Sequence, residues 1–124
     1  MQTTVNIGLV RSETSRVYPK GPLDVAAVLD SVRSLWGSNV KAWAHTSDSE
    51  PTLVIETASR VTLEALAALS VALDQDCIAA FNWDTKRGFM AGPKASLWGP
   101  FNADYFLTPG GVRLSEVIDG PHRY

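Results

Sequence analysis

The sequence contains a single cysteine, Cys77, and no run of apolar residues long enough to span a membrane. One thiol cannot form an internal disulfide, which excludes the disulfide-stapled class of small secreted domains and fits a reducing compartment. A membrane span requires roughly 20 consecutive apolar residues, and the first residues do not combine a basic leader with a long apolar stretch. The sequence therefore predicts a soluble, unprocessed, cytoplasmic protein.

The chain also has no excess of positive charge and no recognisable motif for metals or phosphates. Its 11 basic and 13 acidic residues are interspersed along 124 positions and give a net charge of -2. Such a balance creates no long-range field that attracts nucleic acid or an acidic membrane. The two histidines are far apart, and neither paired cysteines nor a glycine-rich phosphate loop accompanies them. We expect no metal, no cofactor, and neither a membrane nor a nucleic acid as partner.

Hydrophobic periodicity and capping residues predict a regular order of strands and helices. Residues 3–10 alternate apolar and polar side chains, as a strand with one buried face does. Apolar residues then recur at helical spacing between Asp24, which suits the positive end of a helix, and Gly37, which suits its stop. Further along, Thr62 suits the N-cap of a second helix. The remaining predicted elements are strands at 39–47, 52–59 and 76–83 and a helix at 63–75.

The predicted order βαββαβ indicates an α+β fold of the ferredoxin-like type. Right-handed crossovers in this order place both helices on one face of an antiparallel sheet. Residues 84–88 resemble a tight turn in which Gly88 supplies a positive φ angle, so residues 89–92 are expected to add a fifth strand. Prolines and a glycine pair interrupt residues 93–124, which we expect to form an irregular, aromatic extension packed on the core. The whole chain, residues 1–124, is then a single domain.

The second predicted helix lacks the polar side that a helix on a sheet normally presents to water. In one interpretation Leu66, Leu69 and Leu73 face the sheet, and the alanines only raise helix propensity on a mild surface. In the other, small residues let a second subunit approach closely, which makes this helix a candidate dimer contact. The residues of that contact are Ala65, Ala68 and Ala72.

The face of the sheet opposite the helices is a second candidate site. Strand alternation places Trp43, His45 and Glu56 together on this uncovered face, where they could line a pocket for a small molecule. The competing interpretation is that the C-terminal extension folds across the face and buries Trp43.

Residues 82–106 hold about half of the aromatic residues of the chain, beside several charged ones. Tryptophan, tyrosine and arginine are enriched in the energetic centres of protein interfaces. A protein-binding surface here would consist of Asp84, Lys86, Arg87, Lys94 and Trp98. Alternatively, the aromatic residues from Trp98 onward pack the extension onto the sheet and leave only the charged rim for recognition. The sequence contains no recognisable set of catalytic residues. Cys77 lies at the start of a predicted strand, where a cysteine usually packs as a small hydrophobic residue.

The segments "VNIGLV", "TLVIETA" and "LSVALDQDCIAAFNW" give the chain a size and layout over residues 3–83 that resembles small uncharacterised accessory proteins of phages and prophages. The resemblance implies an accessory gene product that binds a host protein, such as a component of a defence system. The first functional hypothesis is therefore a non-enzymatic, protein-binding accessory module. The alternative is a small-molecule-binding domain or small enzyme with its pocket on the open face of the sheet.

Overall fold

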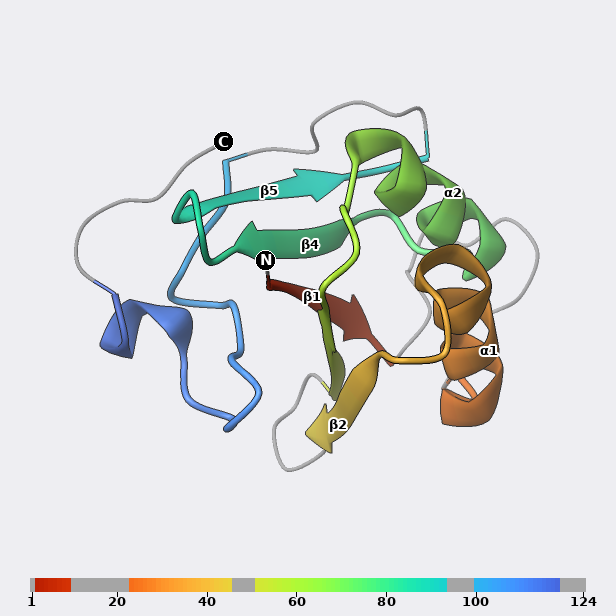
Figure 1. Ribbon diagram of the computed structural model, residues 1–124, viewed down its shortest axis with the longest axis horizontal. Helices are drawn as coiled ribbons and strands as arrows, with labels where there is room; N and C mark the ends of the chain where they lie inside the picture. Colours follow the sequence, from red (N-terminus) through yellow and green to blue (C-terminus); the bar gives the residue numbers. More distant parts are fainter. Residues whose placement is uncertain (1, 10–22, 46–50, 94–99, 119–124) are drawn as a thin grey trace.

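The computed structural model describes residues 2–9, 23–45, 51–93 and 100–118 of the chain. It has an α+β fold, in which five strands and two helices alternate broadly as the sequence predicts (Figure 1). The elements are β1 (Thr3–Gly8), α1 (Val25–Trp36), β2 (Lys41–His45), β3 (Thr52–Thr57), α2 (Leu63–Ala72), β4 (Ile78–Asn82), β5 (Arg87–Ala91) and a short 3-10 helix (Leu114–Glu116).

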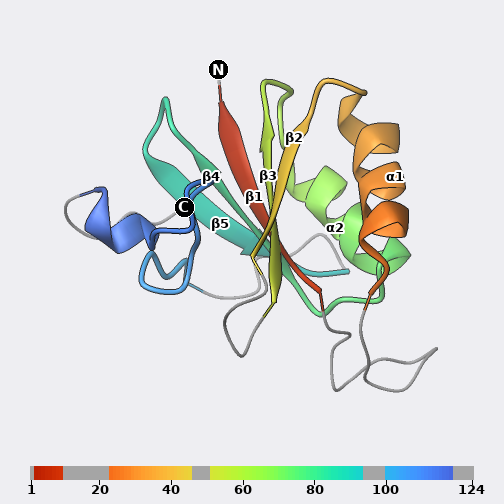
Figure 2. The same cartoon turned by 90° about the horizontal axis from the view of Figure 1, so that it is seen from below.

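The five strands form one sheet in the order β2-β3-β1-β4-β5, and every neighbouring pair is antiparallel. The sheet lies between the two helices on one side and residues 100–118, which we call the C-terminal segment, on the other (Figure 2). Strand β5 pairs with β4 and lies at the edge, so the sheet has one strand more than a four-stranded βαββαβ unit, and its five-strand order is not the order of that unit.

The main core fills the space between the sheet and the helices. Alternate residues of β1 and β3 point into it, as the period of two requires. The prediction that Leu66 and Leu69 of α2 and Leu73, its C-cap, face the sheet is confirmed, since their exposed fractions are 0%, 1% and 7%. The other buried members are Val5, Ile7, Leu9, Val28, Val32, Trp36, Leu53, Ile55, Ile78, Ala80 and Ala91.

Both helix starts are fixed by side-chain caps, and the cap at Thr62 is the one that the sequence predicted. The carboxylate of Asp24 accepts a hydrogen bond from the backbone N–H of Ala26, and the hydroxyl of Thr62 accepts one from Ala65, each at 3.1 Å. These bonds satisfy N–H groups that have no partner within the helix. Gly37 ends α1 with a φ of 87°, a value that favours glycine.

The prediction for the turn between β4 and β5 is wrong in one respect. The positive φ, 58°, belongs to Lys86, whereas Gly88 lies within β5 opposite Phe81. The side chain of Asn82 shapes this turn, because its Oδ1 accepts hydrogen bonds from the backbone N–H groups of Asp84 (2.9 Å) and Thr85 (3.1 Å). The glycine at position 88 has a different role, which depends on the C-terminal segment.

The C-terminal segment packs across the face of the sheet that the helices leave open. We call the side chains of Phe81, Phe101, Phe106 and Leu114 the aromatic cluster; all four are buried together. The ring of Phe101 lies against Gly88, where an added Cβ would come within 2.6 Å of it. Gly88 is therefore required for close packing between the segment and the edge strand.

The C-terminal segment extends over the sheet from the β5 edge to the β2 edge. The side-chain amide of Asn6, on the central strand β1, donates to the carbonyl of Leu107 at 2.9 Å and accepts from its N–H at 2.7 Å. Farther along, Nε2 of His45 on β2 lies 3.3 Å from the carbonyl oxygen of Pro109. Hydrogen bonds on two strands thus fasten a segment whose prolines disfavour long regular structure.

Candidate functional site

The three residues predicted on the open face lie there together. Pairing of β2 with β3 sets Lys41 opposite Glu56 and His45 opposite Thr52, which puts Trp43, His45 and Glu56 on one side of the sheet. All three are half-buried. The C-terminal segment takes up the space over His45, since a Cβ added to Gly111 would lie 3.0 Å from the imidazole ring. A ligand at this position would have to displace that turn.

The three alanines predicted on the second helix do not share one environment. Ala68 and Ala72 are exposed, whereas Ala65 is half-buried against the core. Between the two exposed alanines lies Val71, which is 57% exposed. The surface that α2 presents is therefore a small apolar patch without Ala65.

The charged rim predicted around the hairpin is present at the β4–β5 turn. Asp84, Lys86 and Arg87 are all exposed there. The ammonium group of Lys86 lies 5.0 Å from the centre of the Trp83 ring, a cation–π arrangement that holds this side chain near the turn. Lys94 and Trp98, the other two members of the predicted surface, fall outside the described residues.

Next to this turn, on the side of the sheet that carries the helices, is a cleft of about 810 Å³ that the sequence did not indicate. Both helices lie toward the opposite end of the sheet and leave the end with the β4–β5 turn uncovered on this side (Figure 1). The residues that line the cleft come from β1, the loop before α2, the first turn of α2, and the β4–β5 hairpin. The residues are Thr3, Arg60, Val61, Thr62, Leu63, Glu64, Asn82, Thr85, Arg87 and Phe89.

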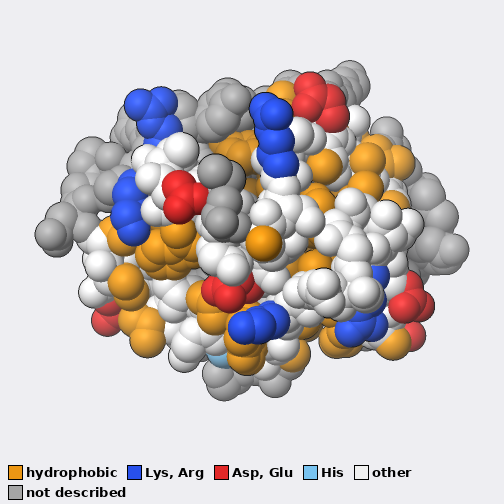
Figure 3. Space-filling view, viewed as in Figure 1, with side chains coloured by type: hydrophobic (Ala, Val, Ile, Leu, Met, Phe, Trp, Pro, Cys, Tyr) orange, Lys and Arg blue, Asp and Glu red, His pale blue; other side chains and the backbone are white. Residues whose placement is uncertain are grey.

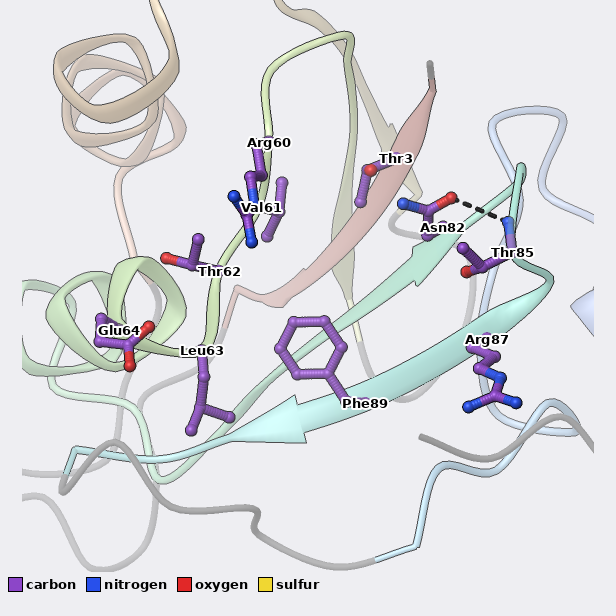
Figure 4. Close-up of a pocket in the computed structure, with 10 residues that line it drawn as sticks. All are labelled: Thr3, Arg60, Val61, Thr62, Leu63, Glu64, Asn82, Thr85, Arg87 and Phe89. Carbon is purple, nitrogen blue, oxygen red and sulfur yellow. Dashed lines mark hydrogen bonds between the residues drawn. The ribbon is translucent and has the colours of Figure 1, made fainter.

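The floor of the cleft is apolar and its rim is charged. Val61, Leu63 and Phe89 are half-buried and pack against the main core. Strand alternation explains why Phe89 and Arg87 share this side of β5, two positions apart. Figure 4 shows the Phe89 ring in the middle of the cleft, with Leu63 and Val61 toward α2 and Arg87 toward the hairpin turn.

Two arginines give the cleft its positive character. Arg60 and Arg87 are exposed, and the guanidinium group of neither forms a hydrogen bond or ion pair with any residue that the structure describes. A guanidinium group presents planar, paired donors that match a carboxylate or a phosphate. Glu64, exposed on the first turn of α2, is the acidic residue of the lining. The arrangement can hold an anionic group beside an apolar one. On this side of the molecule, charged side chains of both signs are spread out with hydrophobic ones between them (Figure 3).

The environment of Cys77 does not favour nucleophilic chemistry. The residue is half-buried just before β4, and its pKa is raised above the ordinary value, first by burial and second by the neighbouring carboxylate of Asp76. A thiol with a raised pKa is protonated at neutral pH and is a weak nucleophile. Within the described ranges, no group of histidine, cysteine, aspartate or glutamate side chains is arranged to hold a metal ion.

Comparison with protein-family models, curated proteins and solved structures found no significant match to this chain. The described part of the chain also contains no helix with the length and apolar character needed to cross a membrane. Function must therefore be inferred from the geometry of the sites themselves.

The sequence contained part of the signal for the cleft. Alternation along residues 87–91 places Arg87 and Phe89 on the same side of the strand, and Thr62 marks where α2 begins. Arg60 precedes that cap and lies in a loop, so neither periodicity nor a motif pointed to it. Only the tertiary arrangement brings the loop next to the hairpin.

Proposed function

We propose that this protein is a non-enzymatic, protein-binding module, and that its partner contacts the hairpin end of the molecule. We call this region the hairpin-end surface: the exposed turn residues Asp84, Lys86 and Arg87 together with the adjacent cleft. We further infer that β1 to β4 and the two helices are a ferredoxin-like unit extended by β5. In that unit each helix connects two strands that flank a third.

The observation that carries the proposal is the cleft, which combines two arginines free of partners among the described residues with an apolar floor around Phe89. Arginine and aromatic residues dominate the energetic centres of protein interfaces, especially where an apolar patch is surrounded by polar groups. The opposite face of the sheet is less suited to a partner, because the aromatic cluster and the turn near His45 already occupy it.

The kind of partner follows from the resemblance to phage and prophage accessory proteins. We propose that the partner is a host protein, with a component of a defence system as the first candidate, and that binding takes place in the cytoplasm. The charged turn supports recognition of a protein by complementary charges, which raise the rate of encounter and select among partners.

A small-molecule-binding function is the second candidate, and the size of the cleft favours it. A volume of about 810 Å³ falls within the range of roughly 300 to 1,000 Å³ typical of ligand pockets. The pocket on the open face, with Trp43, His45 and Glu56, stays a prediction that requires the C-terminal turn to move. Self-association through α2 also stays a prediction, now centred on Ala68, Val71 and Ala72.

Site-specific photo-cross-linking tests the proposed protein-binding function. A photoreactive residue replaces Lys86 on the hairpin-end surface, and a matched one replaces Ser34, which is exposed on α1. In bacterial cells that contain the partner, we expect an adduct with a specific protein from position 86 and none from position 34. The proposal is contradicted if position 86 gives no protein adduct, or if both positions give the same adducts.

A further inference from the structure

We propose that the cleft binds an acidic peptide segment, in which acidic side chains lie on both sides of an apolar one. This inference rests on the proposed function and adds to it the chemistry of the segment that the partner presents. It assigns Arg60 and Arg87 to the acidic side chains and Phe89 to the apolar one.

The positions of the two arginines determine the charge pattern of the segment. Arg60 comes from the loop before α2 and Arg87 from the start of β5, so they approach the cleft from two different walls. Figure 4 shows the Phe89 ring between them. A chain with two separated carboxylates can pair with both guanidinium groups, one on each wall. Carboxylates are suited to this role because guanidinium donors bind them in a bidentate manner.

The apolar floor determines what lies between the two acidic groups. Val61, Leu63 and Phe89 are half-buried, so each still offers part of its side chain to the cleft. Burial of apolar area against this floor favours binding. In an extended peptide, alternate side chains point the same way. When an apolar residue is directed at Phe89, the residues two positions before and two positions after it point the same way, so the acidic residues lie at those two positions.

Polar groups on the hairpin wall match a peptide backbone. Oδ1 of Asn82 is used by the turn, where it accepts from Asp84 and Thr85. Its amide nitrogen points away from Thr85 and toward the cleft (Figure 4). That nitrogen can donate to a peptide carbonyl, and the exposed hydroxyl of Thr85 can act as donor or acceptor.

The surrounding charges favour a peptide over a nucleic acid. The chain has a net charge of -2, and Glu64 lies in the cleft itself. A nucleic acid needs several cationic contacts along its phosphate backbone, and nearby carboxylates repel it. Two carboxylates on a short peptide require only the two arginines. Glu64 weakens the binding of any anion, which makes it a useful position for a test.

The proposal is tested by fluorescence anisotropy with the full chain and labelled, blocked hexapeptides. The panel contains Leu, Phe or Trp between two glutamates. Matched controls have glutamine for both glutamates, or serine for the apolar residue. We expect Arg60→Ala and Arg87→Ala each to weaken binding about twofold to fivefold, the range for exposed ion pairs. Arg33→Ala removes an exposed arginine of α1 outside the cleft and should have no effect.

Two further measurements separate recognition from a general loss of structure. Glu64→Gln should strengthen peptide binding about twofold, since it removes a charge that repels the acidic peptide. The same substitution slightly destabilises α2, because an acidic side chain in the first turn stabilises a helix. The glutamine peptides should bind about fourfold to twenty-five-fold more weakly than the glutamate peptides, since both ion pairs are lost.

The peptide inference is overturned if no glutamate peptide binds, if the arginine variants bind as well as the unaltered chain, or if a single-stranded oligonucleotide displaces the peptide and binds more tightly. Any of these results combined with a specific protein adduct at position 86 rejects the peptide chemistry alone. If position 86 also yields no adduct, the proposed function fails with it.

Discussion

The packing of Phe101 against Gly88 allows a quantitative prediction for the substitution Gly88→Ala. The added Cβ would lie 2.6 Å from Cδ2 and Cε2 of the Phe101 ring and 2.7 Å from Cδ1. Ordinary contacts between carbon atoms are about 3.5 to 4.0 Å, so the ring must retreat by about 1 Å. It has little room to do so, because it is 7% exposed and its centre lies 5.9 Å from that of Phe81 and 5.1 Å from that of Phe106.

The expected magnitude follows from two opposing contributions. Overpacking of a well-filled core costs about 1 to 3 kcal/mol. Replacing glycine by alanine within a strand, where no clash occurs, gains about 0.5 to 1 kcal/mol. Gly88→Ala should therefore lower the free energy of unfolding by up to about 2.5 kcal/mol, with about 1 kcal/mol near the middle of the range. In a chain that already carries Phe101→Ala the clash is gone, and the same substitution should be neutral or slightly stabilising.

Urea unfolding of the four chains, followed by far-ultraviolet circular dichroism, measures this coupling as a double-mutant cycle. We expect the effects of the two substitutions to differ from additivity by about 2 kcal/mol. Equal effects of Gly88→Ala in both backgrounds would refute the packing of the C-terminal segment against β5.

Two other features give measurable expectations. Asn6→Ala removes both hydrogen bonds to the buried backbone of Leu107, so it should lower the free energy of unfolding, measured in urea, by about 1 to 3 kcal/mol. The control Asn39→Ala, at an exposed position, should lower it by less than about 0.5 kcal/mol. Equal costs of the two substitutions would contradict the anchoring role of Asn6. Because the folded state raises the pKa of Cys77, its contribution to stability is fully present below the pKa of the unfolded chain and is lost as the pH rises through the folded pKa. The unaltered chain should therefore lose stability more steeply than Cys77→Ala above about pH 9 in urea titrations, and parallel profiles count against the burial of this thiol.

Much of the fold could be predicted because its signals are local. The alternation of Val5 and Ile7, the helical spacing that follows Asp24 and the cap at Thr62 each depend on a few neighbouring residues, and the structure contains the corresponding strand and helices. The α+β class and the helix-covered antiparallel sheet follow from the order of these elements.

The errors and omissions arise where distant residues meet. The sequence predicted that Gly88 supplies a turn, but the structure shows that a side chain at this position would collide with the ring of Phe101. No local sequence pattern predicts a contact between such distant residues. Asn6 reads as an outward polar residue of a strand, although its amide fastens Leu107 across the sheet. The cleft depends on Arg60 and Phe89, which only the packing of α2 beside the hairpin brings together.

The most direct test of the central claim is an NMR titration of the isotope-labelled full chain with a glutamate peptide that has phenylalanine at its centre. The account predicts shifts of the Nε–H signals of Arg60 and Arg87 and of the backbone amide of Phe89, while the amides of Trp43 and His45 stay in place. Shifts confined to Trp43, His45 and Glu56, or a spectrum that does not change, would contradict it.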